Sequence, residues 1–201
     1  LVLYILIAFA ADPRQRWHWL LYSGAGLALG LILSAWFWWP ALTERELGHM
    51  ADMTTGYFHY SGHFRGLDLI QPRFLFDYDV TAQGTPFAMG FAQALAAVGG
   101  AVVVILAWLR RRFEGFDLFA LLLLVVSTCL ITPLSRPLWE RIPLLPFAQF
   151  PWRFLSAQAC ATALLAAQLP RSLPRPRWVA VGLGALLLIA ALGGLRPERM
   201  M

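Results

Sequence analysis

The residues of this chain that could take part in acid–base or metal chemistry lie in its polar stretches, and one such acidic pair is Asp77 and Asp79. Two carboxylates one residue apart can hold a divalent cation, and either can act as a general base. Short acidic pairs are also common as solvated residues at the entrance to a helix. Asp77 and Asp79 are therefore weak catalytic candidates, and the sequence leaves the catalytic groups unknown.

Three arginines, Arg136, Arg141 and Arg153, lie together in the proline-rich stretch of residues 135–154. A guanidinium group can grip phosphate oxygens with two parallel hydrogen bonds, so these residues could bind the phosphate of a ligand. Attraction to anionic lipid headgroups explains the same three residues equally well. Both interpretations place them at headgroup level.

The backbone of this stretch should be irregular, because its prolines interrupt any helix while the residues between them are too apolar for a loop in water. Non-helical backbone at membrane depth is tolerated only where protein covers it or where it lines a wet cavity. We therefore predict a re-entrant element over residues 135–153. Its motif of Gln149, Phe150, Pro151 and Trp152 is expected beside a site.

The histidines and cysteines do not predict a metal site. His59 and His63 stand four residues apart with His49 upstream, but zinc requires three or four ligands, and no cysteine or carboxylate lies in helical register with them. Ordinary hydrogen bonds among surface aromatic residues are the favoured interpretation. Cys129 and Cys160 lie in apolar runs and are expected to pack there. No cofactor is evident.

The elements that position these residues are apolar segments of membrane length. The chain has 201 residues, of which 59% are apolar and 13% charged, too few charges for a soluble surface. Apolar residues surround each segment on all sides, as a bilayer or a helical bundle requires. We predict an all-α polytopic transmembrane bundle, one integral membrane domain, with full helices at 19–39, 86–109, 116–134, 154–169 and 178–195.

Two long loops and one partial helix complete the predicted domain. The loops cover residues 40–85 and 135–153, and Thr43 with Glu46 has the spacing of a capping box, which predicts a short helix over 44–53. Residues 1–10 form about half of a span, so we expect the end of a helix that begins upstream. The remaining helices of a longer chain are then natural partners.

Loop charge predicts the orientation of the bundle. The short basic connections, including Arg110, Arg112 and Arg171, carry eight arginines against three acids, whereas the other side balances eight arginines with eight acids. By the positive-inside rule the basic side is cytoplasmic, and residues 40–85 and 135–153 face outward. This separation of charge also argues against nucleic acid as the partner and favours membrane lipids.

The helix interiors contain glutamines such as Gln93 and Gln158 but no ionisable side chain near a helix midpoint. Proton relays, ion-coupled carriers and voltage sensors depend on intramembrane charges. The pattern is therefore untypical of a pump core.

Four runs of residues resemble a known family: WWPALTERE at 38–46, TTGYFHYSGHF at 54–64, GTPFAMGFAQAL at 84–95 and LPFAQFPWRFL at 145–155. They resemble bacterial membrane proteins of the 6-pyruvoyl-tetrahydropterin synthase-related family, and FPWRF is the most specific part. The architecture of that family is similar to the C superfamily of polyprenyl-phosphate-sugar glycosyltransferases. The resemblance covers roughly residues 30–160.

The resemblance implies a multi-pass protein of the bacterial inner membrane that takes a sugar from a polyprenyl-phosphate donor at the outer face. Arg153, together with Arg141, would contact the donor phosphate. The catalytic acid of such enzymes lies in an earlier outer loop, which places it upstream of residue 1, and a divalent ion could bind in the full-length protein. Pterin synthase chemistry is not expected, because no histidine triad for zinc is present.

Two other classes remain open, and enzymatic activity is itself uncertain from the sequence. A lipid or polysaccharide transporter would also have many helices and an outer cavity, but it needs a hydrophilic path through the membrane. A noncatalytic membrane scaffold would use the outer loops to bind partners.

Overall fold

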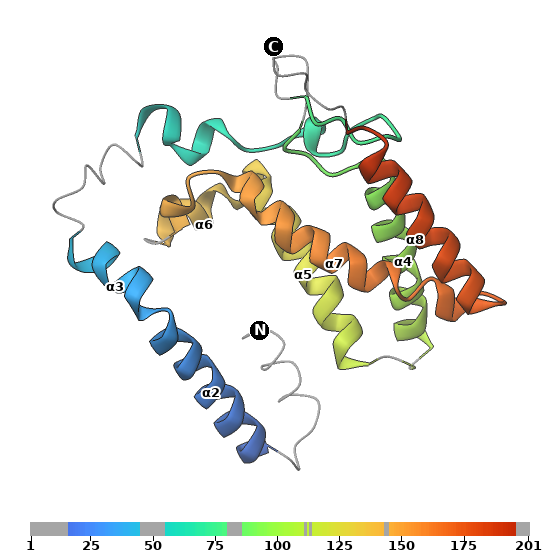
Figure 1. The fold of residues 1–201 in the computed structure, drawn as a ribbon, viewed down its shortest axis with the longest axis horizontal. Helices are drawn as coiled ribbons and strands as arrows, with labels where there is room; N and C mark the ends of the chain where they lie inside the picture. Colours follow the sequence, from blue (N-terminus) through green and yellow to red (C-terminus); the bar gives the residue numbers. More distant parts are fainter. Residues whose placement is uncertain are drawn as a thin grey trace.

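The computed structural model describes residues 16–44, 55–79, 86–110, 112, 114–142 and 145–195. These ranges contain no β-strand and seven α-helices, so the all-α class is confirmed for the described part of the chain. Figure 1 shows their arrangement. The helices are α2 (Arg16–Leu33), α3 (Ala35–Thr43), α4 (Phe91–Leu109), α5 (Gly115–Ile131), α6 (Arg136–Arg141), α7 (Leu155–Ala166) and α8 (Pro176–Leu192).

The body of the structure is formed by α4, α5, α7 and α8, with α7 packed against both α4 and α5 and with α8 packed against α4 (Figure 1). The N-terminal turns of α4 and α7 lie at the same end, where Gln93 and Leu155 line one pocket. The C-terminal half of α5 reaches this end too, since Gln158 donates a hydrogen bond to Thr128 Oγ1 at 2.7 Å. Helices α4 and α7 therefore run in one direction and α5 in the other.

Small residues fill the contact between α4 and α7. Ala94, Ala97 and Gly100 of α4 are buried, as are Ala161 and Ala166 of α7. Small side chains let two helix backbones approach closely, which is the usual packing mode of helices in membranes, where the hydrophobic effect does not drive helix association. Only a few larger residues, among them Leu165 and Val104, contribute to the buried clusters.

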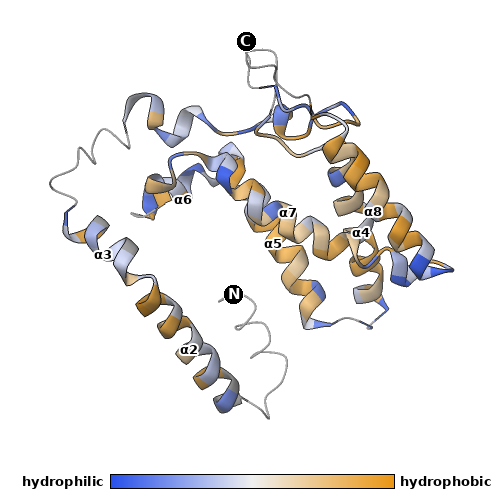
Figure 2. Cartoon of the chain, in the orientation of Figure 1, coloured by the Kyte–Doolittle hydropathy of each residue, from blue (hydrophilic) through white to orange (hydrophobic). Residues whose placement is uncertain are grey.

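Large apolar side chains lie mostly on the outside of the helices. On α4, Leu95, Val98, Val102 and Leu106 are all exposed, and only 33% of the most apolar 18 residues of this helix are buried. Figure 2 shows the apolar colouring continuing over α4, α5 and α8. Large apolar side chains exposed in this number favour a contact with lipid or with other protein segments.

By length and composition, α4 is the one helix in the described ranges that could cross a membrane alone. Helix α5 is long and apolar enough to cross a membrane only together with the segment Pro133–Arg141. The two segments are bent relative to each other by 87°. The apolar parts of α2 and α8 are shorter, at Leu20–Leu33 and Pro176–Leu192. The described residues thus contain one helix long and apolar enough to span a membrane, or two spans if α5 and Pro133–Arg141 form one broken span, where the hydropathy pattern predicts five.

The predicted helix 19–39 is divided in two. The break falls at Ser34, whose hydroxyl donates to the carbonyl oxygens of Gly30 at 2.9 Å and Leu31 at 3.1 Å. Such back-bonding of a serine hydroxyl bends helices. Helix α3 then continues through Pro40 to Thr43, past the predicted start of the loop at residue 40. Apart from α3, α2 makes no extensive contact within the described ranges (Figure 1).

The other predicted boundaries shift as well, because irregular segments replace some predicted helical turns. Helix α4 begins at Phe91 rather than at 86, and α7 ends at Ala166 rather than at 169. Residues 135–153 are not a plain loop, since they contain α6 and the 3₁₀ turns Leu145–Ala148 and Pro151–Phe154. The predicted helices 1–10 and, except for its first residue, 44–53 lie outside the described residues.

The segment 55–79 covers one end of the bundle. Its backbone N–H groups donate to the carbonyl oxygens of helix ends: Arg65 to Ile131 at 2.9 Å and Phe76 to Ala190 at 2.7 Å. Gln71 and Met89 form a further backbone bond of 2.8 Å just before α4. These bonds bring the C-terminal ends of α5 and α8 to the same end of the bundle as the start of α4.

Candidate functional site

Trp139 of α6 joins the two stretches that the sequence predicts as separate outer loops. Its side chain is fully buried, at 0% exposure, and its ring stacks on Tyr60 with centroids 5.0 Å apart. Phe64 and Phe154 meet the same indole edge-on at 5.9 and 6.1 Å. The indole N–H donates to Ser135 Oγ at 3.1 Å, so this large polar aromatic is buried with its donor satisfied.

A second aromatic group surrounds Phe150. Tyr57, Phe58 and His63 from the first stretch contact its ring at centroid distances of 6.5, 6.2 and 4.8 Å. These edge-on contacts are a favourable geometry for aromatic pairs, each worth about 0.5–1.5 kcal/mol beyond buried area. Together with the Trp139 group they fix the 55–64 segment against the FPWRF motif.

Arg153 lies at the end of a row of aromatic rings that we call the aromatic ladder, made of Phe87, Trp152 and Phe150. Trp152 stacks on Phe87 at 4.0 Å and on Phe150 at 5.2 Å. The Arg153 guanidinium carbon lies 5.3 Å from the centre of the Phe150 ring, a cation–π geometry. Its side chain is exposed, and among the described residues no acid pairs with it.

The backbone turn before the ladder is formed by Gln149, which has a φ of 60°. Residues other than glycine rarely adopt this left-handed conformation, which costs roughly 1–2 kcal/mol. Its N–H donates to the Pro146 carbonyl at 2.9 Å, and the buried Pro151 starts the next 3₁₀ turn. The strained turn therefore sits directly before the residues that carry the ladder.

The other two arginines proposed for phosphate binding do not join the ladder. Arg136 forms an exposed ion pair with Glu140, with Nε and Oε1 3.2 Å apart. Arg141 is exposed at the C-terminal end of α6. The structure thus separates the three arginines, and only Arg153 is held against aromatic rings of the motif.

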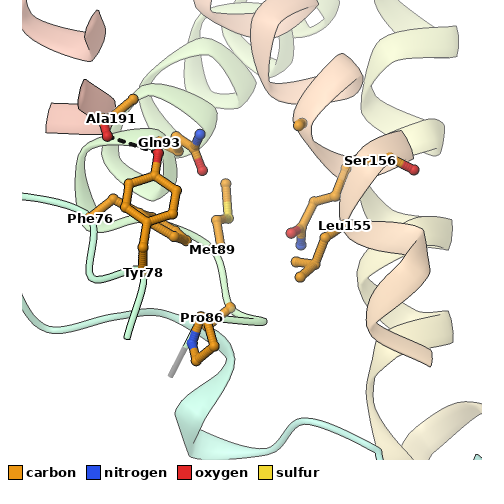
Figure 3. Close-up of a pocket in the computed structure, with 11 residues that line it drawn as sticks. Phe76, Tyr78, Pro86, Met89, Gln93, Leu155, Ser156 and Ala191 are labelled. Carbon is orange, nitrogen blue, oxygen red and sulfur yellow. Dashed lines mark hydrogen bonds between the residues drawn. The ribbon is translucent and has the colours of Figure 1, made fainter. Parts of the chain in front are cut away.

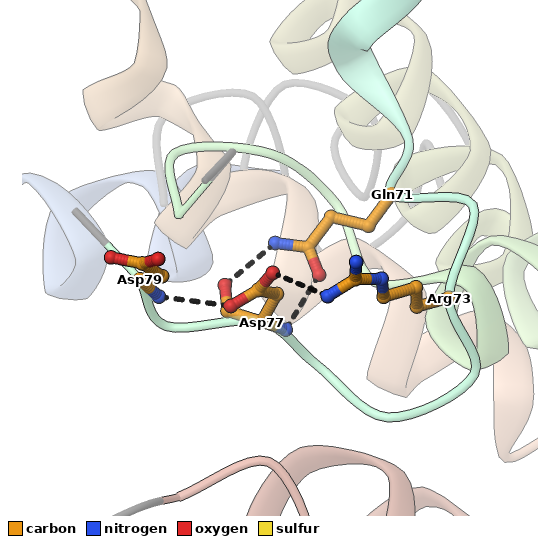
Figure 4. A network of polar contacts seen from close by, with 4 residues as sticks. All are labelled: Gln71, Arg73, Asp77 and Asp79. Carbon is orange, nitrogen blue, oxygen red and sulfur yellow. Dashed lines mark hydrogen bonds and ion pairs between the residues drawn. The ribbon is translucent and has the colours of Figure 1, made fainter. Parts of the chain in front are cut away.

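Asp77 lies at the centre of a network of hydrogen bonds (Figure 4). One carboxylate oxygen accepts from Arg73 at 3.1 Å and the other from the Asp79 backbone N–H at 3.0 Å. The buried Gln71 amide bonds both the N–H and the carbonyl of Asp77, at 2.8 and 2.9 Å. These bonds give Asp77 a structural role in this turn, and each of its carboxylate oxygens keeps a second lone pair. Asp79 is exposed beside it.

Two histidines, His59 and His63, contact neighbouring groups. His59 Nδ1 lies 2.7 Å from Ser61 Oγ, and His63 Nε2 contacts the Tyr57 carbonyl oxygen. Among the described residues, no group of three or more histidine, cysteine or acidic side chains could hold a metal ion. His49 lies outside the described ranges.

Asp68 is the acid of this end of the bundle whose ionisation is clearly perturbed. Partial burial raises the pKa of Asp68, but the hydrogen bonds from Arg65 and from the Gly66 N–H, with the charge of Arg65, outweigh it and lower the pKa overall. The Arg65 Nη1 to Asp68 Oδ2 distance is 2.7 Å. The pair stabilises the turn that follows the first aromatic stretch.

A pocket of about 280 Å³ lies between residues 76–78 and 86–89 on one side and the N-terminal turns of α4 and α7 on the other (Figure 3). Gln93 and Gln158 both line it, together with Phe76, Met89 and Leu155. The sequence marks the two glutamines only as polar residues within apolar segments. Their convergence on one pocket could not be predicted, because it depends on how α4 and α7 pack.

Comparisons with protein-family models, with curated proteins and with solved structures find no match for this chain. The function must therefore be inferred from the geometry and from the motifs in the sequence.

Proposed function

We propose that this chain is part of an integral membrane glycosyltransferase-like protein that uses a lipid-linked sugar donor at the outer face of the membrane. The observation that carries the proposal is the exposed Arg153, which lies over Phe150 at the end of the aromatic ladder. The resemblance of the FPWRF motif to membrane glycosyltransferase-like proteins supports the same assignment.

The membrane setting is supported by the exposed apolar surface and by the small-residue contacts of the bundle. In this proposal α4 spans the bilayer alone, while α5 and α6 form a broken span or re-entrant element, as their 87° bend allows. In the same proposal α2, α7 and α8 also cross the bilayer, and the residues next to each helix complete the length that the crossing requires. The basic connections face the cytoplasm of a bacterium and the aromatic end faces outward.

Arg153 is suited to a diphosphate or monophosphate group because its guanidinium is held by an aromatic ring rather than neutralised by an acid. It could donate two parallel hydrogen bonds to phosphate oxygens. In the proposed reaction the bond between the sugar carbon and the donor phosphate oxygen breaks, and the phosphate leaves with the electron pair. The acceptor hydroxyl forms the new bond, and its proton passes to a base outside the described residues. Arg153 would stabilise the charge that develops on the phosphate.

The test compares Arg153→Ala and Arg153→Lys with the unchanged full-length protein, at matched expression in proteoliposomes that contain a polyprenyl-phosphate-linked sugar. We expect Arg153→Ala to reduce sugar transfer by about 10²-fold or more, as for loss of one charge-stabilising donor. The lysine variant should retain part of the activity. Arg177→Ala serves as the control, because Arg177 is exposed on α8 in the basic part of the chain.

Unchanged transfer in Arg153→Ala would remove the phosphate-binding role. Movement of labelled lipid across the bilayer without any sugar transfer would instead support the transporter class.

A further inference from the structure

The pocket between α4 and α7 has a chemistry different from that of the arginine site. Eleven residues line its volume of about 280 Å³, and none of them is charged. Figure 3 shows Phe76, Tyr78 and Met89 on one side and Leu155 on the other. A short segment of an apolar chain fits a pocket of this volume.

The walls of the pocket are fixed by hydrogen bonds and close packing. The Tyr78 hydroxyl donates to the Ala191 carbonyl at 2.8 Å, which ties the 76–79 segment to the end of α8 (Figure 3). A Cβ on Gly90 would lie 3.1 Å from a ring carbon of Phe76, so the start of α4 is packed tightly against this wall. A preformed apolar cavity with few polar groups is the usual form of a small-molecule site.

Two carboxamides provide the polar groups of the pocket. Gln93 Oε1 accepts from the Gly90 N–H at 3.2 Å, which leaves its NH₂ group to donate. Gln158, whose exposure is 2%, uses its NH₂ group on Thr128, which leaves Oε1 to accept. The pocket therefore offers one uncharged donor and one uncharged acceptor within apolar walls. These match a hydroxyl or ester group and provide no compensation for a buried charge.

The position of the pocket fits a group at the edge of the hydrocarbon layer. Gln93 is in the first turn of α4, the 19-residue helix that can span a membrane. In a lipid bilayer the first turn of such a span lies near the boundary between acyl chains and headgroups, where the ester and hydroxyl groups of acylglycerols are found.

We infer that this pocket binds a neutral acylglycerol lipid, with part of an acyl chain against Phe76, Met89 and Leu155 and with a hydroxyl or ester group bonded to Gln93 and Gln158. The inference rests on the membrane setting of the proposed function, but not on sugar transfer. It assigns a site for an uncharged lipid that is lined by Leu155, two residues after the arginine that is proposed to bind phosphate.

The experiment uses the full chain in phosphatidylcholine nanodiscs that contain a trace of diacylglycerol with a diazirine on one acyl chain. A parallel sample contains phosphatidic acid with the same chains, which differs by its charged phosphate. After illumination, labelled peptides are quantified by mass spectrometry. We expect diacylglycerol to label the peptides around Met89 and Leu155 roughly tenfold more than phosphatidic acid does.

Two alanines of α7 provide a matched pair of variants. Ala159 lines the pocket and Ala163, one turn later, does not, and both are exposed. Ala159→Trp should fill the pocket and remove the diacylglycerol label there, while Ala163→Trp should leave it unchanged. Thermal unfolding of both variants checks that each remains folded, and Gln158→Leu provides a second variant that keeps the volume and removes the acceptor.

Equal labelling by the two lipids, or labelling that Ala159→Trp does not reduce, would overturn the inference and indicate only bulk lipid around the helices. Labelling of the outer surface of α4 without labelling of the pocket would also overturn it, while leaving the membrane setting intact. Sugar transfer measured on the same variants keeps this result separate from the proposed function.

Discussion

A Cβ atom on Gly100 of α4 would lie 2.8 Å from the Cβ of Leu165 on α7, and closer still to the carbonyl group of Leu165. The backbones of the two helices therefore meet at this point, and only glycine leaves room for the contact. Ala97 and Ala161 continue the same small-residue packing on either helix.

Replacing Gly100 with alanine should destabilise the bundle, because the added methyl group must displace backbone rather than the end of a flexible side chain. We expect a loss of about 1–3 kcal/mol, typical of overpacking a filled core. The control is Gly182→Ala on α8, where a Cβ meets nothing within 4 Å. That change should be neutral or stabilise by up to about 1 kcal/mol through helix propensity. Thermal unfolding in detergent, followed by helical circular dichroism, measures both.

Trp139→Ala should separate the two aromatic stretches, because the buried indole contacts Tyr60, Phe64 and Phe154. Loss of a buried tryptophan costs about 3–5 kcal/mol. Trp178→Ala is the control, since Trp178 is exposed on α8. Equal effects of the two substitutions on the unfolding temperature would contradict the anchoring role. A double-mutant cycle with Tyr60→Ala should give a coupling energy of about 0.5–1.5 kcal/mol.

The Arg65–Asp68 pair predicts a pH dependence of stability. Because the pKa of Asp68 is lowered in the folded state, its contribution is present above the ordinary value of 3.8 and is lost as the pH falls through the lowered pKa. The difference in unfolding temperature between the unchanged protein and Asp68→Asn should therefore shrink below about pH 4. The pair is partly exposed, so the difference at neutral pH should correspond to no more than about 1 kcal/mol. A difference that stays constant down to pH 2 would rule out this origin.

Gln149→Gly should stabilise the turn before the aromatic ladder, because glycine adopts a φ of 60° without strain. The expected gain is below about 1 kcal/mol, since the flexible unfolded chain offsets part of the relief. Gln149→Val should destabilise, because a β-branched side chain is disfavoured in this conformation. Arg175→Gly is a parallel test at the other residue with a φ of 60°. Chemical denaturation ranks all three, and destabilisation by Gln149→Gly would show that the side chain matters more than the backbone strain.

The proposed orientation predicts the labelling of two leucines exchanged for cysteine in a protein whose Cys129 and Cys160 have been replaced by alanine. Leu67 and Leu173 are both exposed. Leu67 lies in the segment 55–79, and Leu173 lies in the basic connection before α8. A membrane-impermeant maleimide should label Leu67→Cys in intact spheroplasts and Leu173→Cys only after permeabilisation. The reverse pattern would overturn the orientation, and labelling of both sites in intact spheroplasts would argue against a membrane between them.

Much of the helical architecture can be predicted from the chain because uninterrupted apolar segments leave few other structures for the backbone. The segments around Phe91–Leu109 and Gly115–Ile131 are examples. The connection between them can be recognised in the sequence by its cluster of arginines. Local effects set the exact ends. The Ser34 hydroxyl bends one predicted helix, and the packing of Phe76 against Gly90 accompanies a later start of α4.

The site is less predictable. The residue types and spacing mark Arg136, Arg141 and Arg153 alike as candidates for phosphate binding, and the family resemblance adds weight to Arg153 and Arg141. The structure distinguishes them by their contacts, since Arg136 pairs with Glu140 whereas Arg153 lies over Phe150. The acidic pair is another case, because the engagement of Asp77 depends on the buried amide of Gln71 six residues away.

The amino-acid sequence by itself determined the all-α class and the division of the chain into apolar, basic and aromatic stretches, since these depend on residue type and local spacing. The tertiary structure alone decided that Tyr60 meets Trp139, that Gly100 meets Leu165, and that Gln93 and Gln158 share a pocket. Each of these pairs joins residues far apart in the chain. Their contacts depend on which helix faces pack together, and many arrangements of similar apolar surfaces satisfy the same hydropathy pattern.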